Sequence, residues 1–257
     1  MIKTLLKTFI LTSFCTATLA DAQNLFRTKD RMDRLEGFDD KKFSWGFFLA
    51  ANHYDYKLVL DPKLGMDGDK NAVQSKGDYS FGAGLIGKMR LNESLDLRLE
   101  PGLQFVQREL TFNTQNNLSN ATEVGYFDMS QTTNKIRNVK STYIDIPLLL
   151  EYHGNRWYNS RPYAAAGINY LVNLQSSQGS EDDNANGIFR TTTHNFGWSA
   201  EIGMQFYFGR FKLTPGFRGT FMFNNELVKD NPGTPPYWAS AIATAQSRAL
   251  MFVLKFE

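Results

Sequence analysis

The chain has 257 residues, with 28 Lys and Arg, 26 Asp and Glu, a formal net charge of +2 and a single cysteine. Aromatic residues are 14% and charged residues 21% of the sequence, a composition too apolar and too aromatic for a disordered protein. The near-neutral charge argues against a nucleic-acid partner, and one cysteine excludes a disulfide framework and a cysteine-based zinc site.

Residues 1–22 have the features of a cleaved secretory signal peptide. Lys3 and Lys7 provide the positive start, residues 5–19 are apolar, and an A-x-A cleavage site ends the segment. The lone Cys15 lies in the apolar stretch, so the mature chain is expected to lack cysteine. No later stretch approaches the about 18 apolar residues of a membrane helix. Three classes remain: periplasmic protein, extracellular protein and outer-membrane β-barrel.

Residues 23–42 form a segment of mixed charge before the first predicted strand. Two interpretations are open, a solvated tail and a periplasmic arm that docks a protein partner. The candidate partner-facing residues are Arg27, Lys29, Arg31, Arg34, Asp39, Asp40, Lys41 and Lys42.

Apolar and polar side chains alternate in eight later segments, which predicts eight β-strands. The predicted strands are 43–58, 80–91, 95–108, 142–152, 161–173, 195–208, 211–223 and 243–256. In the third of them, Leu95, Leu97 and Leu99 share one face, and Asp96 and Arg98 share the other. One face of each strand therefore suits an apolar surrounding and the other a polar one.

The connections between these segments alternate in length. The short ones are 92–94, 154–160 and 209–210, and the long polar ones are 61–79, 113–141, 174–193 and 224–242. A soluble β-sandwich would also show the alternation of side chains, but it has no reason to gather every long loop at one end. Tight periplasmic turns and long outer loops are typical of an outer-membrane barrel. We therefore expect residues 43–257 to form an eight-stranded antiparallel up-and-down transmembrane β-barrel with long extracellular loops and both termini periplasmic.

Aromatic residues support this interpretation, because they fall in two groups that suit the two membrane interfaces. The group near the short turns is Trp45, Trp157, Tyr158, Phe206, Phe208, Phe211 and Phe256, and the group near the long loops is Tyr170, Phe196, Trp198, Phe221 and Phe223. Four prolines conflict with the pattern, since each removes a hydrogen bond from a strand. Pro162 can sit at a strand start, whereas Pro101, Pro147 and Pro215 lead us to expect bulges or kinks.

The inward faces of the predicted strands carry charges of both signs. The predicted lumen network comprises Lys88, Arg90, Asp96, Arg98, Glu100, Arg108, Asp145, Glu151, Glu201, Lys212 and Arg218. An eight-stranded barrel is just wide enough to be filled by side chains, so these charges must pair. The expected result is an electrostatic plug that closes the barrel, and the alternative is a gated or conducting pore.

The sequence offers little for catalysis or metal binding. Of the histidines, His53 and His194 are expected on the outside and His153 at the periplasmic rim. His194 with a loop serine and the carboxylates of residues 181–183 could serve a lipid-modifying enzyme, but no nucleophile motif accompanies them. We expect no enzyme, no cofactor and no small-molecule substrate.

A stretch in the first long loop has some features of a calcium-binding loop. Asp67, Asp69 and Asn71 are spaced as in such loops, and Asp78 stands at the last ligand position. However, Ala72 replaces the required glycine and the last ligand is not Glu. A polar surface loop without metal is the favoured interpretation.

Three blocks of the sequence resemble the PorT family, small outer-membrane barrels that the Bacteroidota require for type IX protein secretion. The blocks are F-D-D-K-K-F-S-W-G-F at 38–47, L-R-L-E-P-G-L-Q-F at 97–105 with Q-R-E-L at 107–110, and S-T-Y-I-D-I-P-L-L-L-E-Y at 141–152 followed by Arg161, Pro162, Tyr163 and Gly167. The resemblance begins at about residue 38 and leaves out the long loops, and Ser44 stands where the family is expected to have a histidine.

The resemblance implies a non-enzymatic accessory of type IX secretion, and in gliding relatives of adhesin delivery to the cell surface. It implies other secretion-system proteins as partners, besides the lipids of the outer membrane, and it supplies no catalytic residues. A generic structural or adhesion barrel and a lipid-modifying outer-membrane enzyme remain the alternatives.

Overall fold

The computed structural model describes residues 34–62, 66–67, 70–71, 73–112, 136–181, 188–230 and 239–257. The signal peptide and most of the predicted arm lie outside these residues. Among the described residues, no helix combines the length and the apolar character needed to cross a membrane.

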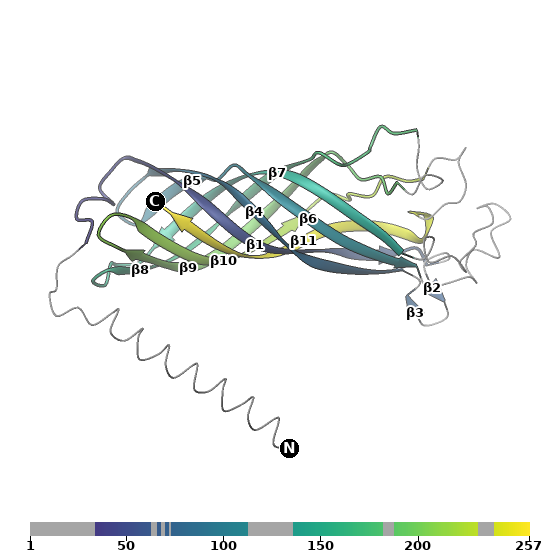
Figure 1. Ribbon diagram of the computed structural model, residues 1–257, viewed down its shortest axis with the longest axis horizontal. Coiled ribbons are helices and arrows are strands. Elements are labelled where there is room, and N and C mark those ends of the chain that lie inside the picture. Colours follow the sequence, from purple (N-terminus) through teal and green to yellow (C-terminus); the bar gives the residue numbers. More distant parts are fainter. Residues whose placement is uncertain are drawn as a thin grey trace, which may run out of the picture. The chain divides into compact units, whose positions relative to one another are not determined.

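Nearly all regular structure of the described residues is β-strand (Figure 1). The strands of the main sheet are β1 (Phe43–Leu60), β4 (Val73–Arg90), β5 (Leu95–Leu99), β6 (Gly102–Phe112), β7 (Ile136–His153), β8 (Ser160–Asn173), β9 (His194–Tyr207), β10 (Lys212–Met222) and β11 (Ile242–Phe256). A separate two-stranded pair, β2 (Met66–Asp67) and β3 (Lys70–Asn71), lies in the β1–β4 connection, and a short 3-10 helix (Ala239–Ala241) precedes β11.

The main sheet closes into a ring. Neighbouring strands are antiparallel throughout, and β1 pairs with both β4 and β11. β5 and β6 are two parts of one strand, since both lie between β4 and β7. The ring therefore has eight strands in chain order, which confirms the expected up-and-down barrel and removes the sandwich. The short connections and the C-terminal end of β11 lie together at one end (Figure 1), here called the short-turn end, and the long connections lie at the other, the loop end.

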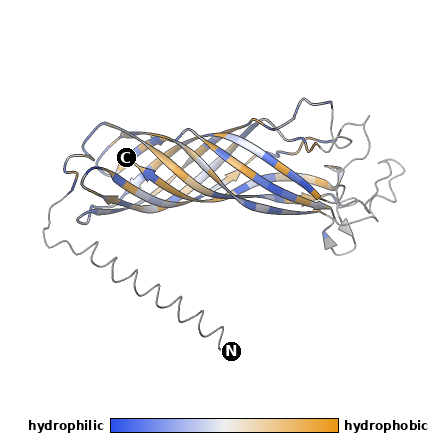
Figure 2. Ribbon diagram, in the orientation of Figure 1, coloured by the Kyte–Doolittle hydropathy of each residue, from blue (hydrophilic) through white to orange (hydrophobic). Residues whose placement is uncertain are grey.

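Alternate residues of each strand face outward and inward, as the sequence pattern predicts. Phe81, Leu85 and Ile202 are 63–65% exposed on the outer wall, while their neighbours Gly82, Ile86 and Glu201 are buried. Figure 2 shows apolar stretches along the strands and hydrophilic segments gathered towards the loop end. An outer wall of exposed Phe, Leu and Ile suits hydrocarbon, where every backbone group must be paired within the protein.

Several strands are longer at the loop end than the sequence pattern predicts. β4 begins at Val73 rather than at residue 80, and β7 begins at Ile136 rather than at residue 142. β1, β4 and β7 each have 18 residues, against the about 9–11 that cross a bilayer. The added segments carry polar outward side chains such as Lys76 and Lys140. These segments keep the hydrogen bonds of a strand but lack outward apolar residues. The alternation of apolar and polar side chains therefore does not predict them as strands.

The strand prolines do not cause the expected bulges or kinks. The registers of β4 with β5 and with β6 are the same on both sides of Pro101, and the β7–β8 ladder runs through Pro147 without a shift. Pro215 likewise pairs with Leu254 in a continuous register. Pro101 only interrupts the strand, separating β5 from β6. The register shifts of the main sheet occur elsewhere, at Val59/Leu60 and between residues 77 and 82.

The interior holds apolar layers as well as charges, a feature absent from the sequence prediction. One cluster in mid-barrel includes Phe48, Ile86 and Met251, and a second at the loop end includes Leu110 and Leu227. The ring of Phe48 occupies the space that a Cβ on Gly84 or Gly102 would need, at 2.5 and 2.7 Å. The polar clusters described next occupy the parts of the lumen that these apolar layers leave.

Candidate functional site: the charged lumen and its two ends

Six buried ionic side chains form a cluster inside the barrel, here called the inner charge cluster. Its members are Arg98, Glu100, Glu151, Glu201, Arg218 and Lys255. They come from β5, the β5–β6 break, β7, β9, β10 and β11, so the cluster joins strands on different sides of the lumen. With three cations and three carboxylates, it is neutral.

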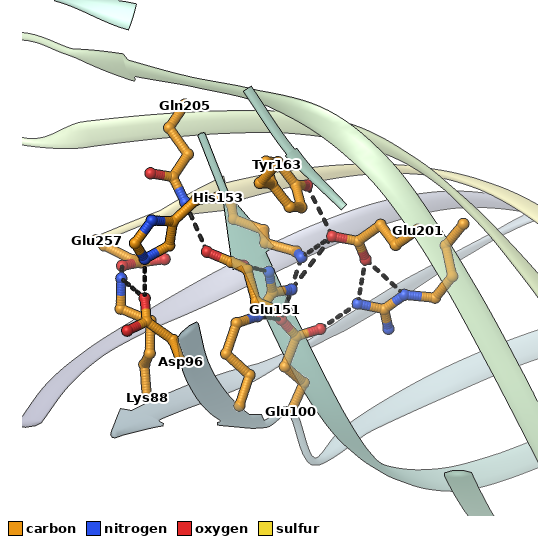
Figure 3. Close-up of polar contacts among 12 residues, drawn as sticks. Lys88, Asp96, Glu100, Glu151, His153, Tyr163, Glu201, Gln205 and Glu257 are labelled. Atoms are coloured by element: carbon orange, nitrogen blue, oxygen red, sulfur yellow. Dashed lines mark hydrogen bonds and ion pairs between the residues drawn. The ribbon is translucent and has the colours of Figure 1, made fainter. Parts of the chain in front are cut away.

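The two guanidinium groups hold the carboxylates in place (Figure 3). Arg98 Nε donates to Glu100 Oε1 at 2.8 Å, and Arg218 Nε donates to Glu201 Oε2 at 2.7 Å. Arg98 also pairs with Glu151, and Arg218 also pairs with Glu100. Lys255, from the last strand, pairs with Glu201 and lies 3.1 Å from Glu100.

Two neutral side chains satisfy remaining acceptor positions of the cluster. The hydroxyl of Tyr163 donates to Glu201 Oε1 at 2.7 Å, and the amide of Gln205 donates to Glu151 Oε1 at 2.7 Å. Buried ions carry desolvation penalties of several kcal/mol each, which only close pairing and additional hydrogen bonds can offset. The arrangement therefore fastens opposite walls together and pairs every charge of the cluster within the protein.

Asp145 lies in a separate hydrogen-bonded chain. Asn169 Nδ2 donates to Asp145 Oδ1 at 3.0 Å, and Ser199 Oγ donates to Asn169 Oδ1 at 2.6 Å. Ser199 also shares a 2.7 Å hydrogen bond with the hydroxyl of Thr220. The chain spans β7 to β10 along the inner wall and ties these strands together beside the inner charge cluster.

A second set of charges closes the short-turn end. This mouth cluster consists of Asp39, Lys88, Asp96, His153, Arg161, Tyr207, Lys212 and Glu257. Lys212 Nζ lies 2.7 Å from Glu257 Oε2, and Lys88 Nζ lies 3.3 Å from the same atom. Lys88 and His153 both approach Asp96 Oδ2, at 3.4 and 3.2 Å. Every carboxylate of the cluster faces at least one cation.

Glu257 shows how strongly this environment favours ionised side chains. Burial alone would raise the pKa of the Glu257 carboxyl, but the charges of Lys212 and Lys88 outweigh it and hold the pKa well below the ordinary value. The carboxylate is therefore ionised throughout the physiological range and joins the ends of β10 and β4 to the end of β11.

Residues 35–42, here called the mouth turn, fold against this end. The turn contains Gly37 at a φ of 70°, and Asp40 N donates to Gly37 O at 3.2 Å. Asp39 Oδ2 accepts a hydrogen bond of 2.5 Å from the Tyr207 hydroxyl and lies 3.4 Å from Arg161. The Phe38 ring lies 5.2 Å from Lys212 Nζ, in a cation–π contact. The mouth turn therefore belongs to the mouth cluster.

A third polar cluster closes the loop end. Arg108 donates to Ser247 Oγ at 2.6 Å and to the Tyr143 hydroxyl at 2.8 Å, and that hydroxyl donates to Glu226 Oε2 at 3.0 Å. Glu226 is fully buried and also accepts from Ser247 N at 2.7 Å. The following Leu227 packs into the apolar loop-end cluster. Part of the connection predicted as an outer loop, residues 224–230, thus dips into the barrel.

A family model described as an outer membrane protein beta-barrel domain matches residues 22–228 of the chain. The chain belongs to this outer-membrane β-barrel family. A comparison with curated protein sequences finds none that matches.

Solved structures of other outer-membrane barrels are similar to this family member at low identity. They include OprG from Pseudomonas aeruginosa, with 15% identity, coverage of 82% of this chain and 93% of that one and a TM-score of 0.41. Neisserial surface protein A is 11% identical, and the match covers 84% of this chain and 98% of that one with a TM-score of 0.39. AlkL is 12% identical, and the match covers 82% of this chain and 88% of that one with a TM-score of 0.40.

In this outer-membrane barrel the structure places ten of the eleven predicted lumen residues inside. Arg90 is the exception, since it lies at the short-turn rim and pairs with the exposed Asp40 at 2.9 Å. Sequence reasoning missed Lys255, Glu226 and Glu257. Lys255 and Glu257 share the inward side of β11 with Val253, so side-chain parity could have identified them. Nothing in the sequence marks Glu226, which lies outside any strand.

The predicted partner-facing arm is only partly within the described residues. Arg27, Lys29 and Arg31 lie outside them, and Arg34 is exposed. Asp39 and Asp40 contact the barrel itself, through Tyr207 and Arg90, and their role towards a partner stays a prediction. Lys41 and Lys42 are exposed, and Lys42 Nζ donates to Arg90 O at 3.0 Å.

The histidines occupy three different environments. His194 lies on the outer wall, where its Nδ1 and the Tyr170 hydroxyl share a 2.7 Å hydrogen bond and the two rings stack. His53 is partly exposed beside Tyr79. His153, expected at the rim, is 4% exposed and bonded to Asp96. Tyr170 thus occupies Nδ1 of His194, and of the carboxylates at 181–183 considered as partners of that ring, residues 182 and 183 lie outside the described residues.

The loop with calcium-like spacing adopts a different structure. Met66–Asp67 pairs with Lys70–Asn71 as β2 and β3, and Asp69 lies outside the described residues. Asp78 lies inside β4, where its side chain accepts a hydrogen bond from Tyr79 N at 2.8 Å. Among the described residues no group of His, Cys, Asp and Glu is arranged to hold a metal ion.

Proposed function

We propose that this barrel is a non-enzymatic accessory of type IX protein secretion, and of gliding-adhesin delivery where the cell glides, acting through protein partners at its periplasmic end. The resemblance of three sequence blocks to the PorT family is the observation that carries this proposal. The short-turn end, where β1 begins and β11 ends, is assigned to the periplasm on the general rule for outer-membrane barrels.

The geometry of the lumen supports a role through surfaces. The inner charge cluster is neutral and fully paired, and the mid-barrel apolar cluster with Phe48 and Met251 lies between it and the polar cluster at the loop end. Moving a solute through would require separating buried ion pairs, each costing several kcal/mol. Binding a protein partner on a surface outside the lumen does not require any buried ion pair to separate.

The location of the first PorT-like block supports a periplasmic contact. Residues 38–47 comprise most of the mouth turn and the start of β1, so this block forms part of the short-turn end. Phe38 and Asp39 close the mouth, whereas Lys41 and Lys42 of the same block remain exposed. We propose that these lysines and the preceding residues 23–34 present the contact surface to the secretion machinery.

The experiment is a clean gene deletion followed by mass spectrometry of the culture supernatant. Cargo with type IX signals should disappear from the supernatant and return with the wild-type gene. A complementing gene lacking residues 23–34, which keeps the mouth turn, should restore a folded barrel but not secretion. His194→Ala should restore both. Unchanged release of cargo in the deletion strain rejects the proposal.

A structural or adhesion barrel is the second candidate, favoured by the long loop end. β1, β4 and β7 continue past the apolar outer wall with exposed polar residues, including Lys57, Lys76 and Lys140. Such a rim would present a rigid surface outside the cell. In that case the deletion strain would secrete normally and lose surface attachment or envelope integrity.

A further inference from the structure

The strand ladder is incomplete where β1 begins. Phe47 pairs with Phe256, the last residue of β11, so the residues before Phe47 pair with β4 alone, from Phe43↔Met89 to Gly46↔Ile86. Gly46 still lies against Phe256, but among the described residues no strand pairs with the opposite edge of residues 43–45. The β9–β10 turn, with Phe211 close to Phe256, lies on the far side of the resulting notch.

A groove of about 440 Å³ occupies this notch on the outer wall at the short-turn end. Its apolar lining consists of Phe38, Phe43, Trp45, Phe47, Phe211 and Phe256. Trp45 is 83% exposed and Phe43 69%, although both are large apolar side chains. The volume is in the range of ligand sites, and the lining would suit a hydrocarbon chain.

Two cations, Lys41 and Arg210, border the groove. The nearby carboxylates are already engaged: Asp40 with Arg90, and Glu257 with Lys212. Among the described residues, no carboxylate lies within ion-pair distance of Lys41 or Arg210. Both side chains are exposed. The groove thus combines an apolar surface with two positive charges that no carboxylate of the described residues neutralises.

We propose that this groove is a binding site for an anionic phospholipid of the periplasmic leaflet. An acyl chain lies along the aromatic lining, and the phosphate lies between Lys41 and Arg210. Anionic headgroups are recognised by such basic clusters at the membrane surface, at about 1 kcal/mol for each Lys or Arg. Lipid binding does not require the secretion role, although Lys41 is shared with the contact surface proposed above, and it depends only on the short-turn end facing the periplasm.

The open edge of β1 could instead pair with an extended peptide of a partner protein. A peptide that adds a strand needs backbone hydrogen bonds along several residues, and in this part of β1 only residues 43–45 lack the second neighbour within the described chain. Their outward side chains already form the aromatic wall of the groove. Lys41, which lies 5.1 Å from the Phe38 ring, and Arg210 also favour an anionic ligand, and a phospholipid supplies the anion at the depth of the headgroups. A phospholipid therefore matches both the apolar lining and the two cations of the groove, which an added peptide strand does not.

The test uses the mature full-length barrel in nanodiscs of phosphatidylcholine with a minor fraction of phosphatidylglycerol. Native mass spectrometry measures which lipids remain bound after the disc is removed. The wild type should retain phosphatidylglycerol in excess over its fraction in the disc. Lys41→Gln and Arg210→Gln should each lower that excess about fivefold, and the double variant should lower it by the product of the two.

A double variant with the same loss of charge, Lys57→Gln with Lys140→Gln on the outer wall of the loop end, provides the control and should retain the wild-type excess. Trp45→Ala should lower retention of both lipids, because it removes apolar contact without changing charge. Equal retention of the two lipids by the wild type, or an excess that survives the loss of both groove cations, overturns the proposal. A peptide that co-purifies on the edge of residues 43–45 and excludes lipid would also overturn it.

Discussion

The hydroxyl of Tyr207 donates a hydrogen bond of 2.5 Å to the carboxylate of Asp39, although 168 residues separate the two in the sequence. The contact joins the end of β9 to the mouth turn that precedes β1. Arg161 and Lys212 approach the same carboxylate, at 3.4 and 4.0 Å. A segment that reads as part of a solvated arm is thereby fixed to the barrel, and this relationship gives the first prediction.

Asp39→Ala should loosen the mouth turn without unfolding the barrel. The substitution removes the acceptor for Tyr207 and the counter-charge for Arg161, so local opening should become easier by about 1–3 kcal/mol. Hydrogen exchange of residues 35–42, followed by mass spectrometry, measures this directly. Asp40→Ala is the matched control, because Asp40 is exposed and its pair with Arg90 should contribute at most about 1 kcal/mol. Equal effects of the two changes would contradict the assignment.

Arg218→Met should destabilise the whole barrel strongly. It leaves Glu201 and Glu100 buried with too little positive charge, at an expected cost of about 3–5 kcal/mol in the free energy of unfolding. Urea unfolding in detergent micelles, followed by tryptophan fluorescence, measures the change. Arg248→Met makes the same substitution at an exposed pair with Asp55 and should cost about 0–1 kcal/mol.

A double-variant cycle sharpens this prediction. Adding Glu201→Gln to Arg218→Met removes one of the uncompensated carboxylates, so the double variant should lose less stability than the two single variants summed. Additive losses would mean that Arg218 and Glu201 do not act as a pair within the cluster.

The Glu257 carboxylate should make stability depend on pH. Its folded-state pKa lies below the ordinary value of 4.5 because Lys212 and Lys88 outweigh the effect of burial. A depressed pKa contributes stability that is fully present above the unfolded pKa and is lost as the pH falls towards the folded one. The stability difference between the wild type and Glu257→Gln should therefore be largest near neutral pH and should shrink below about pH 5. Urea titrations of both proteins across this range would refute the prediction if the difference stayed constant.

A charge on the outer wall tests the position of the membrane. Leu85→Arg places a cation in the apolar belt of β4 and should cost about 2–4 kcal/mol of folding free energy in lipid vesicles. Gln74→Arg, at the loop end of the same strand, should cost about 0–1 kcal/mol, since its side chain lies beyond the belt. Similar costs at the two positions would show that the outer wall of β4 does not face hydrocarbon.

Glu226→Ala should release the segment that closes the loop end. The change leaves Ser247 N and the Tyr143 hydroxyl without their acceptor, at a cost of about 1–3 kcal/mol. Limited proteolysis should then cut within residues 224–230 at a rate well above that of the wild type. Lys229→Ala, an exposed position in the same segment, should leave the rate unchanged. If both variants are cut alike, Glu226 does not hold the segment.

The sequence alone predicted the number of strands, the closure of the sheet into a barrel, and which side chains face outward and inward. Alternation along segments such as 95–108 is a local property, because successive side chains of a strand point to opposite sides whatever the rest of the fold does. The same alternation placed Arg98, Glu201 and Arg218 inside. It did not predict the strand extensions at the loop end, because polar side chains on the outer face there resemble those of a loop.

Only the tertiary structure decided which inward charges meet. Lys255 reaches Glu100, and Asp39 reaches Tyr207, because ring closure and strand stagger bring distant segments to the same depth in the lumen. Alternation specifies the side of the wall on which a residue lies but not its depth along the barrel axis. Glu226 follows no strand pattern at all, and it becomes part of the lumen only because the chain around it folds inward to pair with Ser247 and Tyr143.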